Sequence, residues 1–483
     1  MSSILMLLFK SPYYTYVYDS NNNTIIRISE TLYNDLLDYN KNKELNFTTI
    51  QSEREFIRLR KNGFLFDSII EKIENIYDDD TLTYYLNNKL NMLTLQVTQD
   101  CNFRCSYCRY TLSDHTRSHS EKLMTWDIAR KAIDFFANRV RDSINVNVGF
   151  YGGEPLLRYD FIKQCIEYSK YRLEGKTLTF SLTTNASLLN EEIMNYFATN
   201  DVNILVSLDG PQEINDYNRK FAKNGKGTFD VVYANLSNLL MKNPDFSTHI
   251  GVNAVIDPKY NYSDYDNFFK SEIFNKLNVM TPIVEPPSYQ KLYFSKDFIE
   301  KGNYDKFLFL QSYVDSRSDY EVSPMTNQYK IMLQKTIDNL SSKNSFSPTM
   351  SHGGPCIPGH RRLFVDINGN FYPCEKVSET VSCMKIGNLD NGFNFQNIKN
   401  MLNISAVTED KCKACWALRH CDICIRIAVD DNGINRDVIL KQCRSVRYNI
   451  EQCFRDIVAI NEVRECVINK EGGQVNEGNH ISL

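Results

Sequence analysis

The sequence lacks a long hydrophobic run. No apolar stretch approaches the roughly 18 residues that a membrane-spanning helix needs. Ile4–Phe9 is apolar, but it is too short for the core of a signal peptide and has no basic leader. These absences predict a cytoplasmic protein without a membrane partner.

The sequence also lacks an excess of either charge. It holds 55 Lys and Arg residues against 59 Asp and Glu residues, which gives a net charge of −4 and a pI near 6.1. This balance gives no electrostatic case for a nucleic-acid partner, and no motif that reads RNA or DNA is present. Internal repeats and long low-complexity tracts are missing as well. The 483 residues are enough for two or three domains.

Cysteine, by contrast, is abundant, with 14 residues. In a reducing cytosol, grouped cysteines are more often metal ligands than disulfides. Cys101, Cys105 and Cys108 follow a Cys-x-x-x-Cys-x-x-Cys spacing. Three thiolates hold three irons of a [4Fe–4S] cube and leave the fourth iron free, whereas an ordinary electron-transfer cluster is closed by four cysteines. For this motif alone, a zinc site and a chance spacing are the alternatives.

This cysteine loop resembles the signature of the radical SAM superfamily. The resemblance implies that Cys101, Cys105 and Cys108 are catalytic and that the open iron chelates S-adenosylmethionine. The reduced cluster would cleave this cofactor to a 5′-deoxyadenosyl radical that abstracts a hydrogen atom. The reducing electron would come from a donor such as flavodoxin or ferredoxin.

The chain around this loop alternates between strand and helix patterns, which is typical of a parallel sheet. Each expected strand is followed directly by a polar motif, as at the catalytic end of a βα barrel. The expected strands are Leu93–Thr98, Val146–Phe150, Leu178–Leu182, Asn203–Val206 and Ile250–Ile256. The expected helices are Thr125–Arg139, Asp160–Leu173 and Asn190–Ala198. Together with the resemblance, this alternation implies a partial (β/α)6 TIM-like barrel of the radical SAM type.

The resemblance also assigns residues that contact the cofactor. Gly152 and Gly153 allow close backbone approach and, with Glu154, would meet the methionyl ammonium group. Asn185 and Ser207 are small hydrogen-bonding residues at strand ends, where the family places groups around the ribose and carboxylate. Arg219 is the candidate for bidentate pairing with that carboxylate, and a solvated surface arginine is the alternative.

A second group of cysteines follows the barrel and resembles the SPASM domain, which carries two auxiliary [4Fe–4S] clusters. The resemblance implies three clusters in all. It assigns one auxiliary cluster to Cys412, Cys415, Cys421 and Cys443, and three corners of the other to Cys356, Cys374 and Cys424. Two departures stand out: Cys421 and Cys424 are closer in sequence than the family commonly has them, and Arg361 and Arg362 stand where sulfatase-maturing relatives carry a fourth cysteine. The cluster at Cys356, Cys374 and Cys424, here called the first auxiliary cluster, would then have an open iron unless Cys383 closes it. The four-cysteine cluster is called the second auxiliary cluster. Cys165, Cys453 and Cys466 are left over and interpreted as packing or incidental residues.

The first ninety residues show three short strand patterns followed by two helical ones. They resemble the PqqD-like recognition element of peptide-modifying enzymes, a winged-helix-like α+β domain. In that family the leader of a ribosomal precursor peptide adds a strand to the sheet edge. A structural cap on the barrel is the alternative. Asp78–Asp80 is expected to be a polar linker, the stretch from Pro286 to Pro355 to be less regular, and the chain past Ile460 to fray.

The prediction is therefore an α/β enzyme, a radical SAM/SPASM maturase that forms a Cys thioether cross-link in a precursor peptide. An anaerobic sulfatase-maturing enzyme that makes formylglycine and a carbon–carbon cross-linking maturase are alternatives within the superfamily. A non-catalytic iron–sulfur or zinc scaffold that binds peptides is the alternative from another class. The predicted segments are a recognition domain (1–90), the barrel (91–310), a bridging region (311–345), the SPASM domain (346–455) and a polar tail (456–483).

Overall fold

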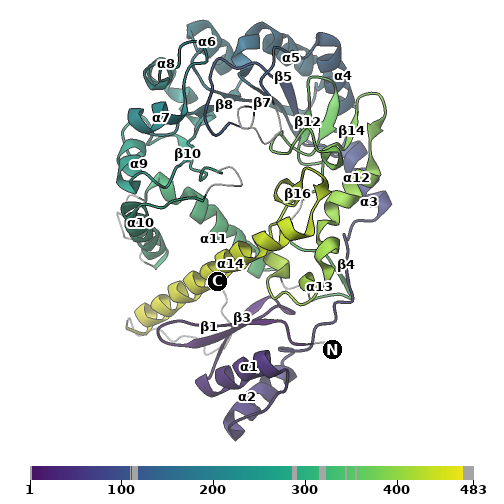
Figure 1. Ribbon diagram of the computed structural model, residues 1–483, viewed down its shortest axis with the longest axis vertical. Coiled ribbons are helices and arrows are strands. Elements are labelled where there is room, and N and C mark those ends of the chain that lie inside the picture. The colour runs from purple at the N-terminus through teal and green to yellow at the C-terminus, as the bar shows by residue number, and fades with distance from the viewer. Residues whose placement is uncertain are drawn as a thin grey trace.

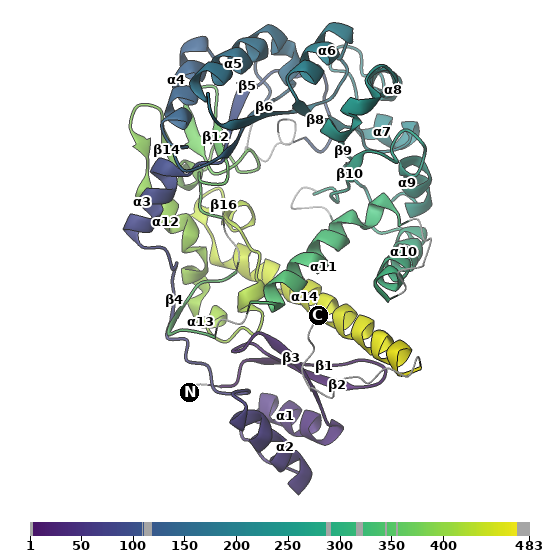
Figure 2. The ribbon, with the colours of Figure 1, turned by 180° about the vertical axis from the view of Figure 1, so that it is seen from behind.

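The computed structural model describes residues 3–108, 110, 118–285, 291–314, 322–342, 345–353 and 356–470. Parts of the predicted bridging region (311–345) and of the stretch from Pro286 to Pro355, including both prolines, lie outside the described residues, and so does the tail beyond Lys470. Three regions follow one another along the chain: a small N-terminal domain, an open barrel and a cysteine-rich C-terminal region (Figures 1 and 2).

The N-terminal domain is a three-stranded antiparallel sheet with two helices. Its strands pair in the order β1-β2-β3. One face of the sheet packs against the helices, through a core that includes Val17, Ile26 and Leu36. The Ser29 hydroxyl accepts a hydrogen bond from the Leu32 amide and so caps the first helix. The elements are β1 (Met6–Lys10), β2 (Thr15–Asp19), β3 (Thr24–Ile28), α1 (Glu30–Asn42) and α2 (Ile50–Lys61).

Six parallel strands form the open barrel, in the spatial order β10-β9-β8-β7-β6-β5. Helices cover the outer side of this curved sheet (Figures 1 and 2). The predicted barrel class and the positions of the expected strands are confirmed. The strands are β5 (Met92–Thr98), β6 (Asn145–Gly152), β7 (Thr177–Thr184), β8 (Val202–Ser207), β9 (Ile250–Asn253) and β10 (Asn278–Met280). The helices are α4 (Trp126–Ala137), α5 (Tyr159–Arg172), α6 (Glu191–Thr199), α7 (Gln212–Asn218), α8 (Phe229–Lys242) and α9 (Tyr262–Phe269).

The C-terminal region extends the barrel sheet instead of forming a separate one. Strand β12 pairs in parallel with β5, and three antiparallel strands continue from it. The last helix, α14 (Arg436–Lys470), runs back past α10 and α11 to the N-terminal domain (Figure 1). The other elements are β4 (Lys72–Ile73), α10 (Lys296–Val314), α11 (Asn327–Leu340), β11 (Thr349–Met350), β12 (Leu363–Val365), β13 (Asn370–Tyr372), β14 (Gly387–Asn388), β15 (Gly392–Phe393), α12 (Phe395–Leu402), α13 (Glu409–Cys412), β16 (Val429–Asp430) and β17 (Gly433–Ile434).

Three sequence expectations are wrong. Asp78–Asp80 does not form a linker, because Asp78 caps the helix α3 (Asp79–Asn88) by accepting a hydrogen bond from the Thr81 amide. The stretch after Pro286 contains the 19-residue helix α10. The chain past Ile460 does not fray at once, because α14 continues to Lys470 and the buried Glu462 side chain anchors it to the N-terminal domain.

None of the described helices is both long enough and apolar enough to cross a membrane.

Candidate active site

The cysteine loop begins where β5 ends. A shift of register at the end of β5 places Thr98 opposite Gly152 of β6. The loop backbone is held from the other side, since the Arg104 amide donates to the Lys220 carbonyl (2.8 Å) and the Ser106 amide to the Asn218 carbonyl (3.0 Å). Two barrel segments far apart in sequence therefore fix the backbone that carries the three thiols.

The thiols of this loop lie in a low-dielectric environment. Burial raises the pKa of Cys101 to about 12 and that of Cys105 to about 11, while the Arg219 guanidinium opposes the rise at Cys105. In the free protein these two thiols are thus protonated at neutral pH. Thiolate is the ligand form, so metal binding has to displace protons here.

Gly152 and Gly153 are required by the packing of the cysteine loop. A Cβ atom on Gly152 would lie 2.2 Å from the Thr98 carbonyl oxygen, and one on Gly153 would lie 2.0 Å from the Asp100 carbonyl oxygen. Gly152 also has a φ of +149°, which side-chain-bearing residues rarely adopt. The close approach in the structure is thus made by the loop itself. Contact with a methionyl ammonium group stays a prediction.

Glu154 ties strand ends together. One carboxylate oxygen accepts from the Thr184 hydroxyl (2.7 Å) and the Leu156 amide (2.9 Å), and the other accepts from the Asn185 amide (2.7 Å). The side chain is 1% exposed, and burial raises the pKa of its carboxyl group against these hydrogen bonds. Glu154 therefore fixes the end of β7 beside the cysteine loop.

The two predicted small polar residues differ in their surroundings. The side-chain Nδ2 of Asn185 donates to the Asn102 side-chain oxygen (2.8 Å) and lies 4.0 Å from the Cys101 sulfur. Ser207, at the end of β8, is half-buried, and its hydroxyl forms no hydrogen bond within the part of the chain that the structure describes. Asn185 therefore lies beside Cys101, and Ser207 lies at the end of the neighbouring strand without a hydrogen-bond partner for its hydroxyl among the described residues.

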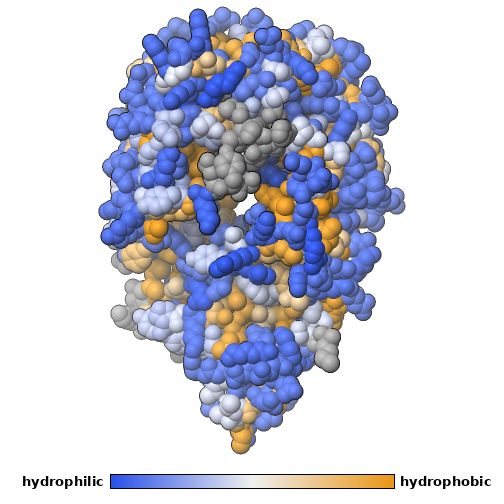
Figure 3. All heavy atoms as spheres, viewed as in Figure 1, coloured by the Kyte–Doolittle hydropathy of each residue, from blue (hydrophilic) through white to orange (hydrophobic). Residues whose placement is uncertain are grey.

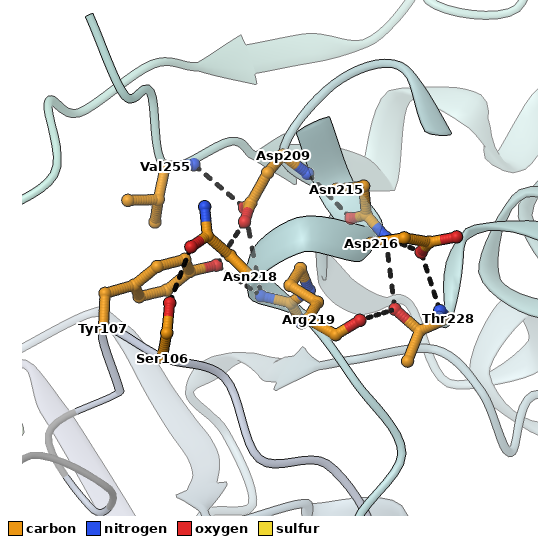
Figure 4. A network of polar contacts seen from close by, with 9 residues as sticks. All are labelled: Ser106, Tyr107, Asp209, Asn215, Asp216, Asn218, Arg219, Thr228 and Val255. Atoms are coloured by element: carbon orange, nitrogen blue, oxygen red, sulfur yellow. Dashed lines mark hydrogen bonds and ion pairs between the residues drawn. The ribbon is translucent and has the colours of Figure 1, made fainter. Parts of the chain in front are cut away.

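Arg219 is buried, so the surface alternative is wrong. It ends α7, and its Nη1 donates to the Tyr107 hydroxyl (2.9 Å) and lies 3.9 Å from Asp209 (Figure 4). Burial lowers the pKa of the guanidinium, but the neighbouring charges outweigh it and the pKa rises well above its usual value. Its Nε is a buried donor without a partner among the described residues. This orphaned donor fits an anionic ligand beside Cys105.

Tyr107 and Asp209 were not assigned a role from the sequence. Asp209 is fully buried and is held by the Tyr107 hydroxyl and by the Val255 amide (3.1 Å) (Figure 4). Both residues stand inside motifs that the sequence made visible, Cys-Ser-Tyr-Cys and Ser-Leu-Asp-Gly. Their contact joins positions 102 residues apart, which no local pattern encodes.

The C-terminal cysteines fall into two groups of neighbours. Burial and then the nearby Cys415 thiol raise the pKa of Cys421, to about 12, and Cys415 has the same effect on Cys412 and Cys443. In the other group, burial and then the Cys424 thiol raise the pKa of Cys356, and Cys356 contributes to raising that of Cys374. The thiols that influence one another are thus members of the same set in the sequence resemblance, and the two clusters themselves stay a prediction.

The remaining cysteines lie apart from both groups. Burial and the Asp430 carboxylate raise the pKa of Cys383, and no other cysteine contributes. Cys165 and Cys453 are buried in hydrophobic cores, and Cys466 is exposed. Among the described residues, no three Cys, His, Asp or Glu side chains are close enough to hold a single metal ion. A cube of iron and sulfide separates its cysteine sulfurs more widely than one ion does, so this finding concerns a single-ion site and not a cluster.

Comparison with known proteins decides the class of the barrel. Residues 95–271 match the model of the radical SAM superfamily. The barrel is that of a radical SAM enzyme. Such an enzyme uses S-adenosylmethionine and a [4Fe–4S] cluster, which fits the three-thiol loop, the buried Glu154 and the orphaned donor of Arg219.

The enzyme is related to anaerobic sulfatase-maturating enzymes. It is 25% identical over 338 residues to a cysteine-type enzyme from Clostridium novyi, a match that covers 68% of this chain and 85% of the relative. It is 34% identical over 198 residues to a serine-type enzyme from Bacteroides thetaiotaomicron, covering 41% of this chain and 47% of the relative. The chain thus spans about half the length of this second relative, and 46% of an uncharacterised Methanocaldococcus jannaschii protein that is 34% identical over 141 residues.

Solved structures agree on the fold. The structure of native anSMEcpe with bound AdoMet superposes with a TM-score of 0.56 at 22% identity, over 77% of this chain and all of that one. A structure of the same protein also contains a bound Cp18Cys peptide.

In the present enzyme, the surface is hollowed at the centre of the molecule, between the barrel and the C-terminal region (Figure 3).

Proposed function

We propose that the enzyme matures a ribosomally made precursor peptide by forming a thioether between a cysteine sulfur and a carbon of the same peptide. S-adenosylmethionine and the catalytic cluster would supply the radical that removes a hydrogen atom from that carbon. Forming the carbon–sulfur bond then releases the thiol proton and leaves one surplus electron. The candidate electron acceptors are two auxiliary clusters of a SPASM domain, which the two sets of cysteines in the C-terminal region would hold.

The observation that carries the thioether proposal is the three-thiol group of Cys356, Cys374 and Cys424. Cys383, the alternative fourth ligand, lies beside Gly433, and none of the three thiols is among the groups that shift its pKa. Arg362, which stands at the position of the missing cysteine, forms an ion pair with Glu375. A vacant iron at this corner is a good site for a substrate thiolate, and it would hold the sulfur near the carbon radical.

Recognition of the precursor is assigned to the N-terminal sheet. One face of this sheet packs on α1 and α2, and the other packs on α14 and the C-terminal region, for example through Tyr18 and Phe454. The edges are the parts of the sheet left for a partner, and β3 has no second strand neighbour among the described residues. A leader that adds a strand needs only such an edge. An electron donor such as flavodoxin or ferredoxin would complete the set of partners.

Formylglycine formation, the reaction expected of a sulfatase-maturing enzyme, is the second candidate, because two of the relatives are named anaerobic sulfatase-maturating enzymes. The N-terminal domain and the incomplete three-thiol group both speak for the thioether maturase. The two reactions give different products from a cysteine peptide. A thioether removes two hydrogen atoms and retains the sulfur, whereas formylglycine formation loses the sulfur.

The test uses a short cysteine-containing precursor peptide, sought among the reading frames beside the enzyme's gene. The peptide is incubated with the reconstituted enzyme, reductant and S-adenosylmethionine without oxygen. The expected product has lost two hydrogens per cross-link and no longer reacts with a thiol reagent. A Cys→Ser peptide should still permit some cofactor cleavage but form no cross-link. Loss of sulfur from the wild-type peptide would favour the formylglycine reaction instead.

The vacant corner has its own test. The cysteine peptide should change the spectroscopic signature of the cluster at Cys356, Cys374 and Cys424, and the Cys→Ser peptide should not. Cys383→Ala should leave the resting signature unchanged. A lost or shifted signature in Cys383→Ala would identify Cys383 as the fourth ligand and make direct binding of the substrate thiolate untenable.

A further inference from the structure

The turn between β2 and β3 of the N-terminal domain contacts the C-terminal region at one short loop. This loop, Trp416–His420, contains the five residues between Cys415 and Cys421. The turn is buried there, with Ser20 0% and Asn23 3% exposed. The N-terminal domain therefore touches the stretch that joins two ligands of the proposed second auxiliary cluster.

Hydrogen bonds from side chains to backbone carbonyls fix the loop from the turn. The Ser20 hydroxyl donates to the Trp416 carbonyl (2.9 Å). Arg419 returns two bonds, from Nε to the Ser20 carbonyl (2.9 Å) and from Nη2 to the Asn21 carbonyl (3.0 Å). The Arg419 guanidinium also lies over the Phe346 ring, 4.3 Å from its centre. A planar donor with two acceptors on one turn leaves the loop little freedom.

Asn23 supplies the side-chain half of the contact. Its Oδ1 accepts from the Tyr18 hydroxyl (2.8 Å) and from His420 Nε2 (3.0 Å), and its Nδ2 donates to the Asn339 and Ser342 carbonyls. Every hydrogen-bonding position of this buried amide is therefore used. Asn23 has a φ of +54°, a conformation that asparagine tolerates better than most residues.

Aromatic packing reinforces the same junction. The Tyr18 ring lies edge-on to Trp416 (6.2 Å between centroids) and to His420 (5.8 Å), and it contacts Phe454 of α14 (4.6 Å). Within the loop, the Leu418 amide donates to the Cys415 carbonyl (3.2 Å) and the Cys421 amide to the Leu418 carbonyl (3.4 Å). A shift of the turn would thus reach the cysteine backbones through one or two hydrogen bonds.

We propose that the β2–β3 turn positions Cys415 and Cys421, and with them the second auxiliary cluster, by fixing the loop between them. The proposal rests on the proposed function, because it requires a cluster at Cys412, Cys415, Cys421 and Cys443. It gives the N-terminal domain a second role that is independent of binding a leader. Part of the cluster site is then supplied by a domain that contributes none of its four ligands.

The test uses full-length enzyme in which Cys101, Cys105 and Cys108 are replaced by Ala, so that only auxiliary clusters contribute to the spectrum. Asn23→Gly removes the side chain and tolerates the positive φ. Arg419→Gln removes the paired bonds to the turn, and Arg419→Lys restores a cation that reaches a carbonyl. Asn21→Ala is the matched control, because Arg419 binds only the backbone carbonyl of Asn21. Cys412→Ala identifies the signal of the second auxiliary cluster.

Asn23→Gly and Arg419→Gln should shift the electron paramagnetic resonance signal that Cys412→Ala abolishes. Both variants should also lose the iron of the second auxiliary cluster to a chelator about tenfold faster than the parent chain, as expected for the loss of one or two buried hydrogen bonds. Asn21→Ala should match the parent chain, and Arg419→Lys should recover most of its resistance to the chelator. Unchanged signal and rate in both variants would overturn the positioning role. A Cys412→Ala chain that keeps its full iron would overturn the cluster assignment itself, and the positioning proposal with it.

Discussion

At the scale of single residues, the buried ion pair of Arg219 and Asp209 illustrates how this active site combines charge with burial. Asp209 is 0% and Arg219 6% exposed, and the Tyr107 hydroxyl lies between them. Burial raises the pKa of Asp209, and the nearby guanidinium opposes this rise only in part. Each buried charge is therefore stabilised by the opposite charge of its partner. The Nε donor of Arg219 has no partner among the described residues and can bind a ligand.

Removing Arg219 should expose this dependence. Arg219→Met leaves the Asp209 carboxylate buried without its counter-ion, which should lower the free energy of unfolding by about 3–5 kcal/mol. Denaturant unfolding of the metal-free protein measures this change. Adding Asp209→Asn to the same chain should recover most of the loss. Arg141→Met is the control, because its ion pair with Asp142 is exposed and should contribute less than about 0.5 kcal/mol. Equal effects at the two arginines would contradict the account.

The catalytic cysteines give the second prediction at this scale. Replacing Cys101, Cys105 and Cys108 together by Ala should abolish formation of 5′-deoxyadenosine, because no thiolate remains to hold the catalytic cluster. Iron content should fall by about four from a full load of roughly twelve per chain. Iron analysis and chromatography of the cleaved cofactor check both results. Cys165→Ala, at a buried cysteine outside the loop, should change neither. Cofactor cleavage by the triple variant would refute the assignment of the loop.

At the scale of the elements, the sequence predicted the barrel well because its signals are local. Each predicted barrel strand is an apolar run that ends at a polar motif, and the observed strands agree within a few residues. Asp78–Asp80 was misread because three acidic residues were interpreted by composition alone, although Asp78 is a good N-cap residue. The Tyr107–Asp209 contact and the junction of the β2–β3 turn with Trp416–His420 join residues about 100 to 400 positions apart. Local patterns do not encode such pairs.

The junction of β6 with the cysteine loop gives a prediction at the element scale. Gly153→Ala places a methyl group where the Asp100 carbonyl oxygen lies, 2.0 Å away, and a backbone atom cannot move aside cheaply. The cysteine loop should therefore be displaced, and about four irons and the cofactor cleavage should be lost while the auxiliary signals persist. Gly302→Ala is the control, since a Cβ there makes only ordinary contacts at 3.4 Å or more. Normal cofactor cleavage by Gly153→Ala would show that the loop tolerates the methyl group.

At the scale of the whole molecule, the barrel and the N-terminal domain have separate hydrophobic cores. The barrel core begins at Leu82 of α3 and contains no residue of the N-terminal sheet. One face of that sheet shares a core with α1 and α2, and the other shares a core with α14 and the loop around Trp416. Chemistry at the barrel and support of the second auxiliary cluster should therefore respond differently when the N-terminal domain is removed.

Deletion of residues 1–66 tests this division, and it spares Leu82 and the strand β4. Cleavage of S-adenosylmethionine without peptide should survive, because the barrel core stays intact. Binding of the precursor should be greatly weakened, because the leader loses its sheet edge. The apolar face of Phe454 and Trp416 becomes exposed, so the cluster at Cys415 and Cys421 should be lost or become labile to a chelator, with a loss of up to about four irons. Calorimetric binding and iron analysis read out the two roles separately. Unchanged precursor affinity would reduce the domain to a support for the cluster, and unchanged iron content would leave it as a recognition domain alone.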